Sequence, residues 1–192
     1  MTRWNGPVIA TVDMLLCLVA VGVALMEPPA VKQALADKPI CQLAVDVEWQ
    51  GDLHVDVDLW VRAPGDTPVG YSAKDGAFFN LVRDDLGTST DSLGINAERA
   101  CASGLPDGEY VANLHLYNHA VPPPFSVAVV VSSVDPVRAE MSEMVKKTAV
   151  LSKKGQELTV VRWRMKDGKL VDGSVHDIPI SLRHGSGQTR RH

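Results

Sequence analysis

The chain has 192 residues, of which 22% are charged and 45% are hydrophobic, and its formal net charge at pH 7 is −4. This length accommodates about one domain, and the composition is that of a globular protein, so a large multidomain enzyme and a disordered chain are excluded. The three cysteines are too few for a disulfide-dense scaffold. The net charge gives no general indication of nucleic-acid binding.

Charge is unevenly distributed along the sequence. Residues 137–192 contain 12 Lys and Arg against 6 Asp and Glu, whereas residues 1–136 contain 7 against 17. The basic C-terminal part would suit an anionic cell-envelope polymer or an acidic partner. The alternative is that these side chains only solvate the surface of a sheet.

An apolar segment over residues 8–26 contains a single ionisable side chain, that of Asp13. As a helix it would span about 28 Å, close to the roughly 30 Å of a bilayer core. Trp4 stands where an interfacial aromatic residue is expected, and two prolines end the segment. Because no small-x-small cleavage site of a signal peptide follows, the sequence predicts a retained membrane helix over residues 8–27.

The flanking charges predict how the protein lies in the membrane. Arg3 precedes the helix and Glu27 follows it, which favours an N-terminus inside the cell. The protein would then be a single-pass protein of the inner (cytoplasmic) membrane, with its main domain in the periplasm or outside the cell. The expected parts are a cytoplasmic tail (1–7), the helix, a linker (28–39), the domain (40–180) and a disordered basic tail (181–192).

Asp13 belongs to a stripe of small or polar residues on the predicted helix. An ionised carboxylate inside a membrane helix costs about 3 kcal/mol or more, so such a residue faces a protein partner or a water path. The alternative is that Asp13 lies shallow enough to reach the lipid headgroups. The spacing of three and four residues along the stripe suits close packing of two helices. The other members of the stripe are Ala10, Cys17, Ala20 and Ala24.

The sequence VDMLLCLVAVGVALMEPP, within residues 7–29, resembles the single transmembrane helix of the ExbD, TolR and MotB family. The resemblance implies a subunit of a proton-driven membrane motor or energy-transducing complex. In that family a dimer of the single-span subunit sits inside a pentamer of a multi-span MotA-, TolQ- or ExbB-like channel subunit. The resemblance places the proton-carrying role on Asp13 alone. No peptidoglycan-binding pattern of the OmpA type follows, so this resemblance ends with the helix.

Beyond the linker, alternating apolar and polar residues predict strands. Residues 41–49 and 53–63 flank a Gln-Gly-Asp turn and are expected to form a half-buried hairpin. Their spacing and that of the later segments predict a mainly β domain, an antiparallel β-sandwich. The further strands are expected near 68–72, 77–83, 98–103, 111–117, 125–134, 143–151 and 157–165.

A second resemblance concerns the domain. The segments VDLWVRAPGDTPVGYS and LPDGEYVANLHLYN resemble a β-sandwich domain of uncharacterised bacterial and phage-encoded proteins. This resemblance covers residues 41–134. It implies a fold and an exterior location, without a defined activity.

Oxygen-bearing side chains gather in the loop after residue 83. Calcium takes six to eight oxygen ligands, and loops rich in Asp and Asn supply them, although the spacing here fits no EF-hand. The alternatives are therefore a calcium site and a solvated acidic loop with Asx turns. The candidate ligands are Asp58, Asp84, Asp85, Asp91, Asn96 and Glu98.

Cys41 and Cys101 would both lie in an oxidising compartment if the domain is exported. A disulfide between them would close a loop of about 60 residues and contribute roughly 4 kcal/mol to stability. The alternative is two buried thiols.

No catalytic arrangement accompanies these features. Asp56 and Asp58 share one strand face and have the residue types of a glycosidase pair, but no nucleophile motif or phosphate-binding loop supports an enzyme. The first hypothesis is the motor subunit, with protons as coupling ion and the sandwich as its force-transmitting or target-binding domain. The second is a membrane-tethered binding module for a cell-surface or cell-wall ligand, in which the helix is only an anchor.

Overall fold

A computed structural model describes residues 40–51, 53–85, 95–119, 122–135, 137–138 and 140–183. This part of the chain is built of β-strands, as expected, and contains no helix. In the same ranges no helix has the length and hydropathy needed to cross a bilayer. The predicted membrane helix, with Asp13 and the stripe of Ala10, Cys17, Ala20 and Ala24, lies outside the described residues.

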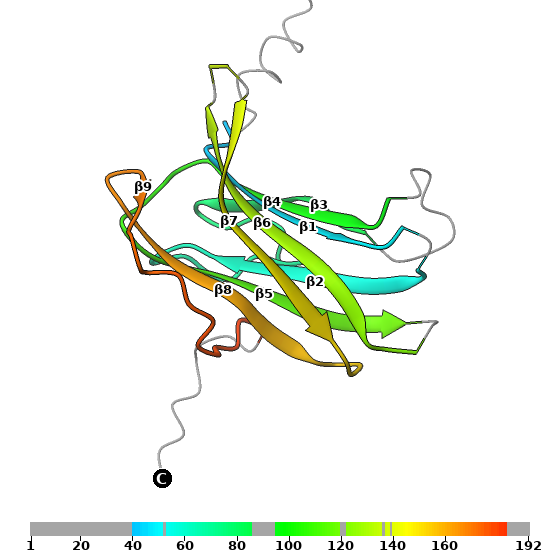
Figure 1. The fold of residues 1–192 in the computed structure, drawn as a ribbon. Helices are drawn as coiled ribbons and strands as arrows, with labels where there is room; N and C mark the ends of the chain where they lie inside the picture. The colour runs from blue at the N-terminus through cyan, green and yellow to red at the C-terminus, as the bar shows by residue number, and fades with distance from the viewer. Residues whose placement is uncertain are drawn as a thin grey trace, which may run out of the picture. The chain divides into compact units, whose positions relative to one another are not determined.

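The strands form two antiparallel sheets that face each other, which confirms the expected sheet architecture (Figure 1). The first sheet has the order β3 (Phe79–Arg83), β4 (Ala97–Ala102), β1 (Leu43–Trp49), β6 (Phe125–Asp135) and β7 (Glu140–Leu151). The second has the order β2 (Val55–Arg62), β5 (Gly108–His119), β8 (Glu157–Lys166) and β9 (Lys169–Leu170).

The strands β1 and β2 are neighbours in sequence but belong to different sheets, so the expected hairpin of residues 41–49 and 53–63 is wrong. β1 pairs with β4 and β6, whereas β2 pairs with β5. Both strands turn their apolar residues toward one core, and Val45 and Val57 are fully buried there. Strict alternation shows that one face of a strand is buried, but it does not select the strand with which it pairs.

The segment near residues 68–72 is not a strand, contrary to the prediction. It forms isolated bridges, in which Val69 exchanges two backbone hydrogen bonds with Val61 of β2. Gly70 lies against the indole of Trp60, so close that an added Cβ would come within 2.5 Å of the ring. The segment therefore covers Trp60, which is 5% exposed although it projects from the face of β2 opposite the core.

The core lies between the two sheets and is built from the inward residues of all the long strands. Tyr110 and Trp163 stack with their ring centroids 5.4 Å apart, and both are fully buried. The Tyr110 hydroxyl donates a hydrogen bond to the Pro106 carbonyl at 2.8 Å. Burial raises the pKa of Tyr110 to about 12, so this phenol stays protonated over the physiological range.

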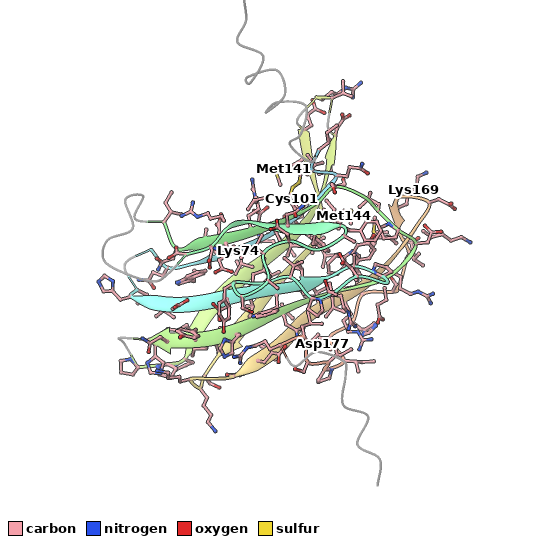
Figure 2. The ribbon with its side chains drawn as sticks, turned by 180° about the vertical axis from the view of Figure 1, so that it is seen from behind. Lys74, Cys101, Met141, Met144, Lys169 and Asp177 are labelled. Atoms are coloured by element: carbon pink, nitrogen blue, oxygen red, sulfur yellow. A yellow bond between two sulfur atoms is a disulfide. The ribbon has the colours of Figure 1, made fainter. Side chains whose placement is uncertain are left out.

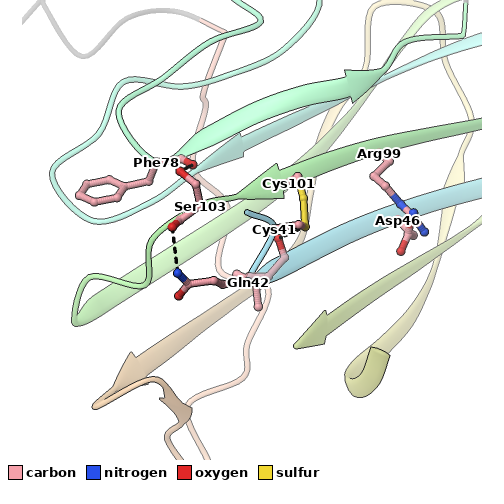
Figure 3. Close-up of a disulfide and its surroundings, with 8 residues drawn as sticks. Cys41, Gln42, Asp46, Phe78, Arg99, Cys101 and Ser103 are labelled. Carbon is pink, nitrogen blue, oxygen red and sulfur yellow. Dashed lines mark hydrogen bonds and ion pairs between the residues drawn. A yellow bond between two sulfur atoms is a disulfide. The ribbon is translucent and has the colours of Figure 1, made fainter. Parts of the chain in front are cut away.

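A disulfide joins Cys41, just before β1, to Cys101 on β4, with the two Cα atoms 5.5 Å apart (Figure 3). Beside it the Gln42 amide donates a hydrogen bond to the Ser103 carbonyl at 3.0 Å. Further along the same pair of strands, Arg99 pairs with Asp46. The start of the domain is thus tied covalently and by polar contacts to a strand 60 residues away.

Residues 177–183, here called the C-terminal strap, cross the outer face of the second sheet. The Ile180 carbonyl accepts hydrogen bonds from Asn113 on β5 and Thr159 on β8. Leu182 is 2% exposed and packs against Trp60. Residues 181–183 were expected to belong to a disordered tail, but these contacts hold them against the sheet. The rest of the predicted tail, residues 184–192, lies outside the described residues.

Candidate binding site

A hollow of about 190 Å³ lies on the outer face of β2 and β5. Two of its residues come from β2, one from β5, one from the segment that covers Trp60, and one follows β3. We call this set the acidic pocket. Its lining residues are Asp56, Asp58, Tyr71, Asp84 and Tyr117.

The alternation of β2 explains why two carboxylates meet here. Because successive side chains point to opposite faces of a strand, Asp56 and Asp58 share the outer face while their neighbours enter the core. On β5, His115 lies directly opposite Asp58. The register then shifts by one residue, and this bulge inserts Tyr117 between two paired positions. The Tyr117 side chain lines the hollow together with Asp56 and Asp58.

Asp58 and His115 form a buried hydrogen-bonded pair. The Asp58 Oδ2 and His115 Nδ1 atoms are 2.7 Å apart, and the two side chains are 6% and 3% exposed. Burial raises the pKa of Asp58 to about 7 and lowers that of His115 to about 4. Both shifts favour the uncharged forms, so the pair holds one shared proton between these values and titrates as a unit.

Asp56 is half-buried at the rim of the pocket. Burial is the main reason why its pKa rises to about 7, and the negative charges of Asp58, Asp84 and Asp85 add to the effect. At neutral pH the carboxyl groups of Asp56 and Asp58 are therefore only partly ionised. A positive charge in the pocket would draw off the remaining protons, because an opposite charge nearby favours the ionised form.

Glu98 reaches the same region from β4 in the other sheet. Its side chain is 1% exposed, and Oε2 accepts a hydrogen bond from the Leu59 N–H at the free edge of β2. The Oε1 atom has no hydrogen-bond partner among the described residues. Burial raises the pKa of Glu98 well above its usual value, and the charges of Asp58 and Asp84 act in the same direction. Burial therefore favours the protonated form of this carboxyl group next to the pocket.

The predicted calcium ligands have several different roles. Asp84 forms a salt bridge with Lys74, with 2.7 Å between the Lys74 Nζ and Asp84 Oδ2 atoms. Asp85 accepts a hydrogen bond from the Ala97 N–H. The Asn96 amide donates to two backbone carbonyls, those of Gln50 and Leu53. Asp91 lies outside the described residues. Among the described residues, no group of three or more His, Cys, Asp or Glu side chains is arranged to hold a metal ion. Calcium binding therefore stays a prediction.

Aromatic rings form one wall of the pocket. Tyr71 stands edge-on to Tyr117 with ring centroids 5.9 Å apart, and edge-on to Trp60 at 5.7 Å. The two tyrosines are 36% and 50% exposed, whereas Trp60 is buried behind Tyr71. Aromatic faces beside carboxylates attract organic cations, because the ring quadrupole is negative over the face.

Sequence reasoning found the carboxylates of this site but missed the other members. Asp56, Asp58 and Asp84 were recognisable from strand alternation and from the acidic loop. His115 was visible only as a histidine on a predicted strand, without any sign that it opposes Asp58. Tyr71 comes from a segment without regular structure, for which no periodicity exists, and only the folded chain places it beside β2.

The basic residues of the C-terminal part do not form one continuous strand face. Lys146 and Lys147 lie on β7 of the first sheet, whereas Arg162 and Arg164 lie on β8 of the second. Arg162 pairs with Glu109, whose pKa is lowered by that contact. Binding of an anionic polymer therefore stays a prediction.

The acidic pocket combines partly ionised carboxylates, two accessible rings and a volume larger than a metal ion requires. Such an arrangement suits a ligand that carries an ammonium or guanidinium group. The chain matches no protein family model, no curated protein and no solved structure. Its function is therefore inferred from its own residues.

Proposed function

We propose that this chain is a membrane-tethered binding module whose β-sandwich domain captures a positively charged group of a cell-surface or cell-wall ligand in the acidic pocket. The observation that carries the proposal is the convergence of three carboxylates and two tyrosine rings on one hollow. The tether is the predicted membrane helix over residues 8–27. With the N-terminus inside the cell, the pocket would face the periplasm or the exterior.

The chemistry of the pocket favours an organic cation over a metal ion. Tyrosine rings cannot supply the six to eight oxygen ligands of calcium, but a ring face stabilises an organic cation by about 0.5–2 kcal/mol. The ammonium or guanidinium N–H groups would donate charge-assisted hydrogen bonds to Asp56 and Asp58. Because both aspartates have a pKa of about 7, binding should strengthen as the pH rises through 7.

A calorimetric titration of the full chain in mild detergent tests this proposal, with agmatine as the probe because it carries both cationic groups. Asp56→Asn should weaken agmatine binding by about tenfold, the effect of losing one charge-assisted hydrogen bond of roughly 1.4 kcal/mol. The matched control is Glu48→Gln, which removes an exposed carboxylate on β1 outside the pocket. Absence of agmatine binding to the unaltered chain, at pH 6 and at pH 8, would overturn the proposal.

The second candidate is the single-span subunit of a proton-driven motor, with the pocket as the target-binding site of its exported domain. The observation that favours it is the presence of Asp13 in an apolar segment, on the stripe of small residues of the predicted helix. The proposed partners are a second copy of the chain and a pentameric multi-span channel subunit. Protons would be the coupling ion.

The two candidates make different predictions for the helix. If the chain is a motor subunit, Asp13→Asn should abolish energy transduction while the complex with the channel subunit still assembles, because the asparagine keeps the packing but carries no proton. If the helix is only an anchor, its replacement by an unrelated single-span helix should preserve function. Co-purification from native membranes, followed by an assay of both variants, separates the two.

A further inference from the structure

We propose that the basic C-terminal end of this chain, residues 184–192, occupies the acidic pocket and competes there with the external ligand. This inference rests on the proposed function of the pocket as a site for a cationic group, and it adds a mode of regulation. The occupant is a segment that follows directly on the C-terminal strap. It carries the sequence HGSGQTRRH, which includes Arg190 and Arg191.

The strap delivers this segment to the pocket. The Glu157 carboxylate accepts hydrogen bonds from the Leu182 N–H and from the Ser181 hydroxyl, both at 2.7 Å. These contacts bring Arg183 close enough for its positive charge to lower the pKa of both Asp58 and His115. The last described residue of the chain is therefore already within electrostatic range of the pocket.

The length of the segment is sufficient for the proposed contact. Arg190 is seven residues beyond Arg183, which corresponds to an extended reach of about 25 Å. Since the segment is tethered, its local concentration at the pocket would be in the millimolar range, as for short linkers. A weak contact would thus be enough to fill the pocket for most of the time.

The chemistry of the segment matches that of the pocket. The planar guanidinium group of arginine binds carboxylates through two parallel hydrogen bonds and stacks on aromatic faces. The pocket offers both partners, the carboxylates of Asp56 and Asp58 and the exposed rings of Tyr71 and Tyr117. Lys74, a cationic side chain beside the pocket, is paired with Asp84 and not with Asp56 or Asp58.

The carboxyl group of Glu98 belongs to the same electrostatic environment as the pocket. Glu98, which is 1% exposed and has Asp58 and Asp84 as its electrostatic neighbours, keeps one carboxyl oxygen without a hydrogen-bond partner among the described residues. A cation that arrives beside Asp58 and Asp84 would lower the charge repulsion among these carboxylates.

The contact should depend on pH in a defined direction. Above about pH 7 Asp56 and Asp58 are ionised and attract the arginines, whereas below it they become protonated and release them. An external cation needs the same ionised groups, so acidification weakens both contacts. The charged and titratable groups that face the pocket or its neighbours are Asp56, Asp58, Tyr71, Lys74, Asp84, Asp85, Glu98, His115, Tyr117, Glu157 and Arg183.

The test compares three forms of the chain in mild detergent at pH 8, with agmatine as the probe. They are the unaltered chain, a chain that stops after Arg183, and the double variant Arg190→Ala, Arg191→Ala. If the segment fills the pocket for nine tenths of the time, the shortened chain should bind agmatine about tenfold more tightly, and the double variant should approach it. The charge-matched control is Lys153→Ala, Lys154→Ala, which should bind like the unaltered chain.

A second measurement separates the failure of this inference from the failure of the proposed function. A synthetic peptide of residues 184–192 is added to the shortened chain, and the His115 and Asp58 signals are followed by NMR. Equal agmatine affinities for the unaltered and shortened chains would overturn the inference and leave the proposed function standing. If no form binds agmatine, the proposed function fails, and an unchanged NMR spectrum on peptide addition would then overturn the inference as well.

Discussion

Side chains on the outer face of β2 show how a fold can hold carboxyl groups close to their titration point at neutral pH. Asp56 and Asp58 lie on one strand face, near Asp84, and Asp56 is half-buried whereas Asp58 is buried. Burial and mutual repulsion both disfavour the ionised forms. The pocket can therefore change its charge over a narrow pH range around 7.

The stability of the domain should fall as the pH rises from about 5 to 8. Between their unfolded value of 3.8 and about 7, Asp56 and Asp58 bind more protons in the folded state, so deprotonation destabilises it. His115 has the opposite effect on stability between about pH 4 and 6.5, because its pKa is lowered in the folded state. The raised pKa of Glu98 adds to the effect of the two aspartates, so the three carboxyl groups together outweigh the one histidine. Thermal unfolding of the full chain in detergent at several pH values measures this trend.

Asp56→Asn serves as the matched variant in this experiment. It removes one of the destabilising charges, so it should raise the unfolding free energy at pH 8 by about 1 kcal/mol, after allowance for solvent screening of this half-buried group. At pH 5 it should have little effect. A rise in stability with pH in the unaltered chain would contradict the assignment of the carboxyl groups as partly protonated.

At the scale of the elements, β7 forms one edge of the first sheet. Its ribbon with β6 extends beyond the neighbouring strands (Figure 1), and Met141 lies on the extended part (Figure 2). Unpaired backbone groups along an edge invite pairing with another chain, and an inward-pointing charge on the edge strand prevents it. Lys147 is such an inward-facing charge on β7. It lies opposite the buried Val129 of β6 and is on the same face of the sheet.

Lys147→Val should therefore promote self-association through β7. The valine keeps the strand propensity and removes the charge that another strand would have to bury. Lys146→Val is the matched control, since the neighbouring side chain points to the opposite face of the same strand. Sedimentation or light scattering of the two variants over a concentration series should show association for Lys147→Val alone. Equal behaviour of the two variants would contradict the role given to Lys147.

Over the whole domain, the disulfide between Cys41 and Cys101 ties the start of the described chain to the first sheet. The double variant Cys41→Ser, Cys101→Ser should lose about 2–4 kcal/mol of unfolding free energy, because the cross-link restricts the unfolded chain across a long loop. Reducing agent should lower the unfolding temperature of the unaltered chain by the same mechanism. The double variant is the control for that treatment, because its unfolding temperature should not respond to reducing agent.

The positions of most strands could be predicted from the sequence because their signal is local. Alternation in 53–63 identified β2 and its two faces. The pairing of β2 with β5 could not be predicted, since several strands have equally apolar faces. The segment around Val69 was mistaken for a strand because a short apolar run resembles one.

Within this protein, the sequence by itself determined the mainly β class, the outward face of Asp56 and Asp58, and the presence of an apolar N-terminal segment with one aspartate. These follow from periodicity and hydropathy, which depend on neighbours along the chain. Only the tertiary structure decided that His115 opposes Asp58, that Tyr71 and Tyr117 close the pocket, and that the strap ends beside it. Those contacts join residues up to about 120 positions apart, and burial there shifts the protonation of groups that would be ordinary in an extended chain.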